Sequence, residues 1–121
     1  MKKKVLIVDD SAFMRLFIKN MLSKYEFEIV GEADSGAMGV EIYKSLRPDV
    51  VTMDITMPEM SGIESLKAIK AFDPDAKVIM VSAMGQEKMM KEAILSGAKT
   101  FIVKPFKEEF MFQTINKVLG I

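Results

Sequence analysis

Short apolar runs alternate along the chain with longer stretches in which apolar residues recur every three or four positions. Runs rich in β-branched residues are typical of strands, and the three-to-four periodicity is typical of amphipathic helices. The pattern therefore predicts five strand–helix repeats. The predicted strands are residues 4–10, 27–33, 49–54, 76–83 and 99–105. The predicted helices are residues 11–25, 35–46, 61–72, 86–97 and 107–119.

Local signals mark several of these boundaries. Ser11 is a suitable N-cap for the first helix, and Gly97 ends the fourth. Gly36 and Gly39 lower the helix propensity of 35–46, so we expect a weak helix there. For the run 27–33 we expect a shorter and more polar strand, as suits the edge of a sheet.

The fold class follows from the order and composition of these elements. Several strands are near-continuous apolar runs, which is what a sheet covered on both faces requires. Right-handed crossovers through the intervening helices then give an α/β fold, a single doubly wound parallel sheet of five strands with five helices. We expect one domain over residues 1–121, without an output domain.

Polar side chains stand where four of the predicted strands end. Asp9 and Asp10 end the first strand, Asp54 the third and Ser82 the fourth, and Lys104 follows the fifth. The carboxyl ends of parallel strands share one edge of the sheet, where ligand sites of this fold class lie. The sequence therefore predicts that these side chains form one site.

This set of side chains indicates metal-dependent phosphoryl chemistry. Clustered carboxylates repel one another, which raises at least one pKa unless a cation binds. Oxygen ligands favour Mg²⁺, with Mn²⁺ as an alternative, over zinc. Lys104 and Ser82 offer a charge and a hydroxyl to a tetrahedral dianion, and Asp54, apart from the pair Asp9–Asp10, is the candidate nucleophile.

Composition excludes several other function classes. The 17 basic residues balance the 17 acidic ones, which gives no electrostatic case for binding nucleic acid or an anionic membrane. The chain has no cysteine and no histidine, so it has no disulfide, no thiolate or imidazole metal ligand and no histidine phosphocarrier. No apolar stretch is long enough to span a bilayer, and we expect a cytoplasmic protein.

Four motifs together resemble those of a response-regulator receiver domain. They are VLIVDD, MDITMPEMSG, VSA and FIVKPF, in that order and on the expected elements. The resemblance covers essentially the whole chain and is strongest to the stand-alone chemotaxis regulators of the family. It implies a flavodoxin-like sheet with strand order 2-1-3-4-5, which the strand pattern alone does not supply.

The resemblance also implies a role for each residue of the metal site. Asp54 matches the phosphoacceptor and a metal ligand. Asp10 matches a direct Mg²⁺ ligand, and Asp9 matches an acidic partner that acts through water. Thr56 stands where the family supplies a backbone carbonyl to the metal.

A second group of positions matches the family's switch. Lys104 matches the lysine that pairs with the phosphoryl group, and its bond to Pro105 would be cis. Ser82 matches the switch hydroxyl. Phe101 matches the switch aromatic, which is often tyrosine in chemotaxis regulators, so a partner contact that needs a tyrosine hydroxyl is in doubt.

The implied partners are proteins. The phosphodonor would be a phosphohistidine of a histidine kinase, and the targets a flagellar motor switch protein and a phosphatase. The chain would be a monomeric phosphoacceptor and not a substrate-turnover enzyme. A phosphorelay intermediate and the isolated receiver of a larger regulator are the alternatives. The expected partner-binding residues are Met90, Phe101, Val103, Phe106 and Lys107.

Rival classes fit the residues less well. A flavodoxin would bind phosphate in the first strand–helix loop, but DDSAFMR would repel it without a metal. A haloacid-dehalogenase-type phosphatase needs a second aspartate two residues after the nucleophile, where this chain has Thr56. A plain interaction module needs no acidic cluster. Each candidate alone also has an ordinary explanation as a cap, turn or loop residue, so the hypothesis depends on their occurring together.

Overall fold

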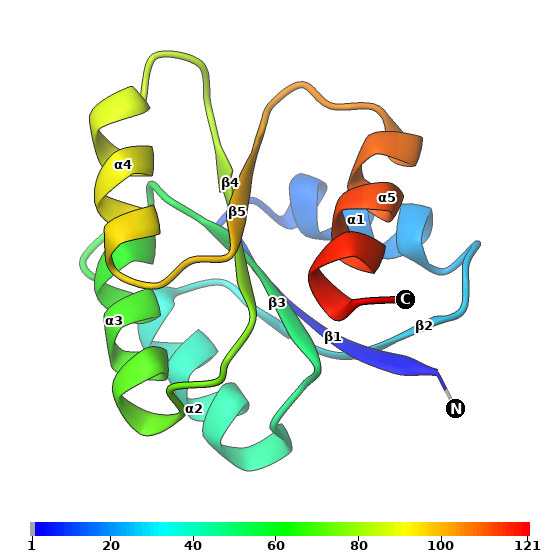
Figure 1. Ribbon diagram of the computed structural model, residues 1–121, viewed down its shortest axis with the longest axis horizontal. Coiled ribbons are helices and arrows are strands. Elements are labelled where there is room, and N and C mark those ends of the chain that lie inside the picture. Colours follow the sequence, from blue (N-terminus) through cyan, green and yellow to red (C-terminus); the bar gives the residue numbers. More distant parts are fainter. Residues whose placement is uncertain (1) are drawn as a thin grey trace.

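The apolar runs of the sequence form one sheet in which every neighbouring pair of strands is parallel. The computed structural model describes residues 2–121 (Figure 1). The strand order is β2-β1-β3-β4-β5, which confirms the expected order. The strands are β1 (Lys3–Val8), β2 (Phe27–Ala33), β3 (Val50–Asp54), β4 (Val78–Ser82) and β5 (Thr100–Val103).

Helices cover both faces of this sheet. Figure 1 shows α2, α3 and α4 on one side and α1 and α5 on the other. None of the helices within residues 2–121 has the length and apolar character needed to cross a bilayer. The helices are α1 (Ala12–Leu22), α2 (Gly36–Leu46), α3 (Gly62–Phe72), α4 (Glu87–Leu95) and α5 (Glu108–Leu119).

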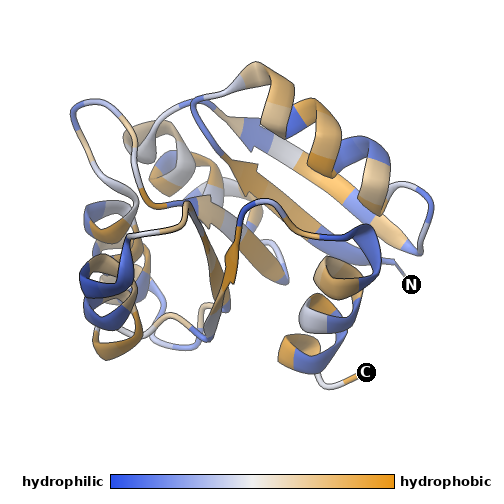
Figure 2. Ribbon diagram, turned by 90° about the horizontal axis from the view of Figure 1, so that it is seen from above, coloured by the Kyte–Doolittle hydropathy of each residue, from blue (hydrophilic) through white to orange (hydrophobic). Residues whose placement is uncertain are grey.

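The strands divide their side chains between two apolar cores. In β1, Leu6 and Val8 pack in the core beneath α2, α3 and α4, whereas Val5 and Ile7 pack in the core beneath α1 and α5. Successive residues of a strand point to opposite faces, so a strand that feeds both cores has to be apolar throughout. Figure 2 shows this as strands in hydrophobic colours beside helices that alternate between hydrophobic and hydrophilic residues.

One expectation about an individual element needs correction, and the glycines of one helix have a role in packing. β2 lies at the edge as predicted, but its seven residues make it the longest strand and not a shorter one. This length is compatible with an edge position, because Glu28 is exposed and Glu32 pairs with Lys19 of α1 at 3.2 Å. α2 is a regular helix of 11 residues despite its glycines. A Cβ at Gly39 would lie 2.9 Å from Val8 Cγ2, so this glycine allows close packing on β1.

Gly62 fixes how α3 leaves the end of β3, and its replacement by alanine should be strongly destabilising. A Cβ at this position would collide with the backbone carbonyl oxygen of Asp54 and lie 2.9 Å from Ile55 Cα. Backbone atoms cannot turn aside as a flexible side chain can. We expect Gly62→Ala to lower the free energy of unfolding by about 3 kcal/mol, measured by urea unfolding followed by circular dichroism.

Gly120→Ala is the matched control for this substitution. Gly120 has φ 74° and no atom within 4 Å of its Cβ position, so alanine there meets only backbone strain. We expect this variant to lose about 1 kcal/mol. If Gly62→Ala lost no more than Gly120→Ala, the close approach of α3 to Asp54 would not constrain the fold.

Candidate functional site

Three carboxylates meet at the carboxyl edge of the sheet. Asp9 and Asp10 directly follow β1, and Asp54 is the last residue of β3, the strand beside it. One carboxylate oxygen from each residue lies within 4.8 Å of those of the other two. Asp9 and Asp54 are buried, with 1% and 7% of their surface exposed, while Asp10 is exposed. The structure therefore brings together the three acids that the sequence places at strand ends.

Lys104 reaches this acidic cluster from β5, two strands away from β3. Its Nζ lies 3.4 Å from Asp9 Oδ2 and 3.5 Å from Asp54 Oδ1. Its backbone N–H donates to the carbonyl of Ser82 at 2.8 Å, which fixes the loop to the end of β4. The Lys104–Pro105 peptide bond is cis, as the family resemblance implies. One ammonium group thus faces two carboxylates, and the site keeps an excess of negative charge.

The pKa of the Asp54 carboxyl is raised from its ordinary value of 3.8 to about 6. Burial is the largest cause, and the negative charges of Asp9 and Asp10 add to it, while Lys104 acts in the opposite direction. Burial raises the pKa because the ionised form loses its hydration. The Asp54 carboxylate is therefore ionised at pH 7 but poorly compensated by its surroundings.

The oxygen atoms of the cluster fit a small divalent cation. Both Asp9 oxygens already have partners, since Oδ1 accepts from the Ser11 N–H at 2.9 Å and Oδ2 faces Lys104. Asp10 is exposed and accepts no hydrogen bond from the protein within residues 2–121. Mg²⁺ commonly takes one or two carboxylates and keeps several waters. The cluster thus offers carboxylate oxygens of the kind that such an ion binds.

Ser82 lies at the end of β4 with no exposed surface. Its hydroxyl donates to the sulfur of Met90, on α4, at 3.1 Å. Met90 is also buried, with 8% of its surface exposed, so it presents little to a partner in this arrangement. In this arrangement the side chain of Met90 contacts the Ser82 hydroxyl inside the fold, and its contact with a partner stays a prediction.

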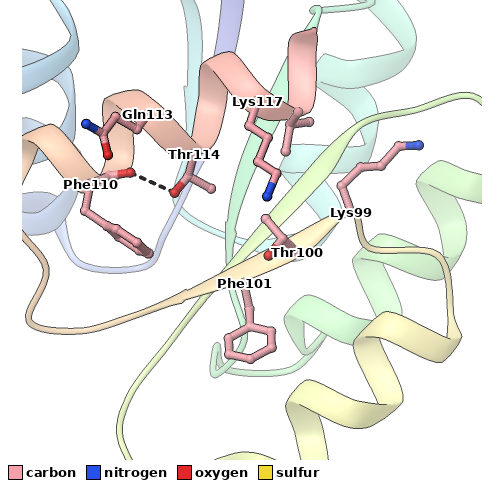
Figure 3. A pocket seen from close by; sticks show the side chains of 8 residues that line it. Lys99, Thr100, Phe101, Phe110, Gln113, Thr114 and Lys117 are labelled. Atoms are coloured by element: carbon pink, nitrogen blue, oxygen red, sulfur yellow. Dashed lines mark hydrogen bonds between the residues drawn. The ribbon is translucent and has the colours of Figure 1, made fainter.

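The other expected partner residues lie near one another on the surface of β5 and α5. A hollow of about 420 Å³ is lined by Phe101, Val103, Phe106 and Lys107, together with Pro105 and Phe110. A larger hollow of about 600 Å³ follows along β5 and α5, and Figure 3 shows Phe101 from β5 and Phe110 from α5 beside it. Phe101 is 37% exposed and Phe110 52%. The smaller hollow is mainly apolar, whereas polar and charged side chains line most of the larger one, namely Lys99, Thr100, Gln113, Thr114 and Lys117.

Two residues at the site carry no signal in the sequence. Arg15 of α1 donates from Nη1 to the backbone carbonyl of Asp9 at 2.7 Å and so supports the acidic loop. Gln86 hydrogen-bonds through its side chain to Ala83 and Thr56, in the loops that follow β4 and β3. Arg15 is in a helix and Gln86 directly precedes one, and for polar residues at such positions a solvent-exposed side chain is the ordinary expectation. Only the path of the loops shows that these two side chains contact the site.

Comparison with known proteins adds a family to this geometry. The family model described as response regulator receiver domain matches residues 5–116. The chain is 56% identical over 118 residues to the chemotaxis protein CheY of Thermotoga maritima, covering 98% of both chains. It is 57% identical over 120 residues to the chemotaxis protein CheY of Bacillus subtilis, covering 99% of this chain and 100% of the relative.

Solved structures with the same fold include chemotaxis proteins. A chain of the CheX–CheY–BeF₃–Mg²⁺ complex from Borrelia burgdorferi superposes with a TM-score of 0.91 at 42% identity, covering 96% of this chain and 88% of that chain. The response regulator domain of Thermotoga maritima CheB superposes with a TM-score of 0.91 at 37% identity, covering 100% and 98%. The similar sequences and the similar structures therefore indicate the same family.

The raised pKa of Asp54 should make the stability of the protein fall as pH rises. In the unfolded chain the carboxyl ionises near pH 4, while in the folded protein its pKa is about 6. The folded state therefore holds the extra proton between these values, and stability is lost as pH rises through this window. Asp54→Asn removes the charge, so at pH 7 without divalent cations its free energy of unfolding should be about 2 kcal/mol higher than that of the original protein.

Thermal and urea unfolding at pH 4.5 and pH 7 would measure this difference. The advantage of Asp54→Asn should shrink at the lower pH, where the original side chain is protonated, and should also shrink when Mg²⁺ is added at pH 7. Asp75→Asn, at an exposed aspartate outside the cluster, is the control. An advantage that did not change with pH would show that charge at position 54 is not its cause.

Proposed function

The chain belongs to the response regulator receiver domain family, and on this premise we propose that it is a signalling switch phosphorylated on Asp54. The phosphodonor would be a phosphohistidine on a histidine kinase. The observation that carries this proposal is the position of Lys104 Nζ, 3.4–3.5 Å from both Asp9 and Asp54 and at the open side of the cluster. An ammonium group there is suited to an incoming phosphoryl group.

The transfer itself is a displacement at phosphorus. A carboxylate oxygen of Asp54 forms the new O–P bond as the N–P bond of the phosphohistidine breaks, and the ring, already protonated on its other nitrogen, leaves as neutral imidazole. With a pKa of about 6, Asp54 is ionised and nucleophilic at pH 7. Lys104 is placed to neutralise charge on the phosphoryl oxygens, which is the main task of a catalyst for a loose, in-line transition state.

A bound Mg²⁺, or Mn²⁺, would supply the remaining positive charge at this site. Asp10 and Asp54 would hold it directly and Asp9 through water, with the backbone carbonyl of Thr56 as the further ligand that the family supplies. The chain would undergo one phosphorylation and a later hydrolysis of its own acyl phosphate, so we propose a self-modifying switch and not an enzyme that turns over a separate substrate.

The phosphoryl group on Asp54 would change the rest of the fold through contacts with Ser82 and a movement of Phe101. The Ser82 hydroxyl now donates to the sulfur of Met90, which is a weak acceptor. A phosphoryl oxygen is a much stronger one, so the hydroxyl would turn toward Asp54. Phe101, half-exposed on β5, would then turn inward and change the surface formed by α4, β5 and α5.

Chemotaxis is the signalling process that the relatives support. Two relatives at 56% and 57% identity are named chemotaxis protein CheY. We propose a flagellar motor switch protein as the target, bound at the apolar surface around Phe101 and Phe106. The CheX–CheY–BeF₃–Mg²⁺ complex among the similar structures supports a phosphatase as a second partner. We propose that the chain acts in the cytoplasm as a monomer.

Intact mass spectrometry after incubation with acetyl phosphate tests the phosphoacceptor directly. We expect one phosphoryl adduct that requires Mg²⁺, disappears with excess chelator and is absent from Asp54→Asn. Asp75→Asn should be modified as the original protein is. The absence of an adduct on folded, Mg²⁺-bound protein at short incubation times, or an adduct that persists in Asp54→Asn, would contradict the proposal.

The contact between Ser82 and Met90 predicts a variant that switches more readily. In Met90→Leu the buried hydroxyl loses its acceptor, so the resting state is destabilised while the phosphorylated state is not. We expect the ratio of phosphorylated to unmodified protein at limiting acetyl phosphate to rise about two- to fivefold. Met89→Leu, at the exposed neighbouring position, is the control. An equal effect of both variants would rule out a role for the sulfur.

A further inference from the structure

The side-chain amide of Gln86 joins the loop that follows Asp54 to the loop that follows the neighbouring strand β4. Gln86 Oε1 accepts the backbone N–H of Ala83 at 2.7 Å, and Gln86 Nε2 donates to the hydroxyl of Thr56. Ala83 directly follows Ser82 at the end of β4, and Thr56 comes two residues after Asp54 at the end of β3. We call this pair of hydrogen bonds the Gln86 bridge.

The bridge takes the place of a helix cap at the start of α4. Gln86 is the N-cap residue of α4, yet its side chain makes no hydrogen bond to the first turn of that helix. Gly85, with φ 89°, turns the chain immediately before it. The side chain of Gln86 is thus bonded to the loops around the site, while its backbone carbonyl accepts the N–H of Met90 at 3.0 Å as in a regular helix.

We infer that Gln86 is a positioning residue that holds the loop between β4 and α4 in its resting arrangement and so opposes switching. This inference depends on the proposed function, because it concerns what the loop does when Asp54 is phosphorylated. If Ser82 turns toward the phosphoryl group, the adjacent Ala83 moves with it and the bridge breaks. Contacts that exist in only one of two states shift the equilibrium toward that state.

The bridge also connects the switch hydroxyl to the metal side of the site. One anchor is next to Ser82, and the other is the residue whose carbonyl is expected at the metal. Movement at either loop therefore loosens the other and releases the N-cap residue of α4 at the same time. Gln86 is partly exposed, so water can replace its contacts, and the bridge can open without a large barrier.

The affinity for beryllium trifluoride, a mimic of a phosphoryl group, tests the inference in the presence of Mg²⁺. Gln86→Ala removes both hydrogen bonds from the resting state, so we expect the affinity to rise about three- to tenfold. In the unliganded protein, hydrogen exchange at the Ala83 amide should become faster by a similar factor. Gln113→Ala, at an exposed glutamine on α5, is the control and should change neither quantity.

A double-mutant cycle with Thr56→Val shows whether the two residues act together. Valine keeps the backbone carbonyl and the side-chain shape but removes the hydroxyl that Gln86 contacts. We expect each single variant to raise the affinity, and the double variant to raise it by less than the product of the two single effects. If the two single changes in affinity multiplied fully in the double variant, Gln86 and Thr56 would act independently and the inference would be overturned.

Gln86→Glu separates the bridge from a general loss of structure. The carboxylate can still accept a hydrogen bond from the Ala83 N–H and can accept another from the Thr56 hydroxyl, so the slow exchange of the Ala83 amide should be retained. The added negative charge should lower the affinity for beryllium trifluoride, the opposite of the change in Gln86→Ala. A decrease in both variants, with faster exchange in both, would show a structural role only and overturn the inference.

The outcome for the original protein distinguishes failure of the inference from failure of the proposed function. Binding of beryllium trifluoride that needs Mg²⁺ and is lost in Asp54→Asn, with no change in Gln86→Ala, would reject the bridge and keep the phosphoacceptor. Binding that is absent from the original protein, or unaffected by Asp54→Asn, would reject the phosphoacceptor and the bridge with it.

Discussion

The repulsion between two buried carboxylates is the interaction on which the rest of the site depends. Asp9 and Asp54 lie at the ends of adjacent strands with 1% and 7% of their surface exposed, and within residues 2–121 Lys104 is the one cationic side chain that faces both. One ammonium group cannot neutralise them together with the exposed Asp10, so the site keeps a deficit of positive charge. Burial and repulsion raise the pKa of Asp54 to about 6, which leaves a carboxylate that is ionised at pH 7 but unstable in that form. A cation relieves the repulsion, and a phosphoryl group bonded to Asp54 would use the same positive charges.

The parallel sheet makes this arrangement possible without a dedicated pocket. Strands β1 and β3 are neighbours and end together, which places their last residues side by side. Lys104 directly follows β5, so its long side chain has to pass the end of β4, where its own backbone N–H is bonded to Ser82. The two apolar cores below stabilise the strands up to Asp54 itself, since every residue of β3 is buried. The unfavourable charges thus stand at the ends of buried strands, where the packing below holds them close together.

The sequence predicts the elements and the edge of the sheet, but not the contacts made by side chains in loops. Hydrophobic periodicity locates five strands and five helices, and the polar residues after Val8 and Met53 are placed together by the rule for parallel strands. The strand order came from the family resemblance, because several orders bury the same apolar runs. The burial of Met90 and the bridge of Gln86 depend on the path of the loop between β4 and α4. Gly85 sets that path, and no periodicity reports it.

The contacts that connect the site to α4 are weak, and weak contacts suit a switch. Ser82 donates to a sulfur, and Gln86 makes neutral hydrogen bonds in a partly exposed position. A neutral hydrogen bond contributes about 0.5–1.5 kcal/mol net, whereas one to a charged group contributes about 1.5–3 kcal/mol. A dianion on Asp54 would therefore outcompete the resting partners of Ser82 and Ala83, but only while it is attached. Strong resting contacts would hold α4 in place whatever happened at Asp54, and an absence of contacts would let α4 move without a signal. The contacts seen here lie between these limits, which is the condition for a surface that responds to one covalent bond.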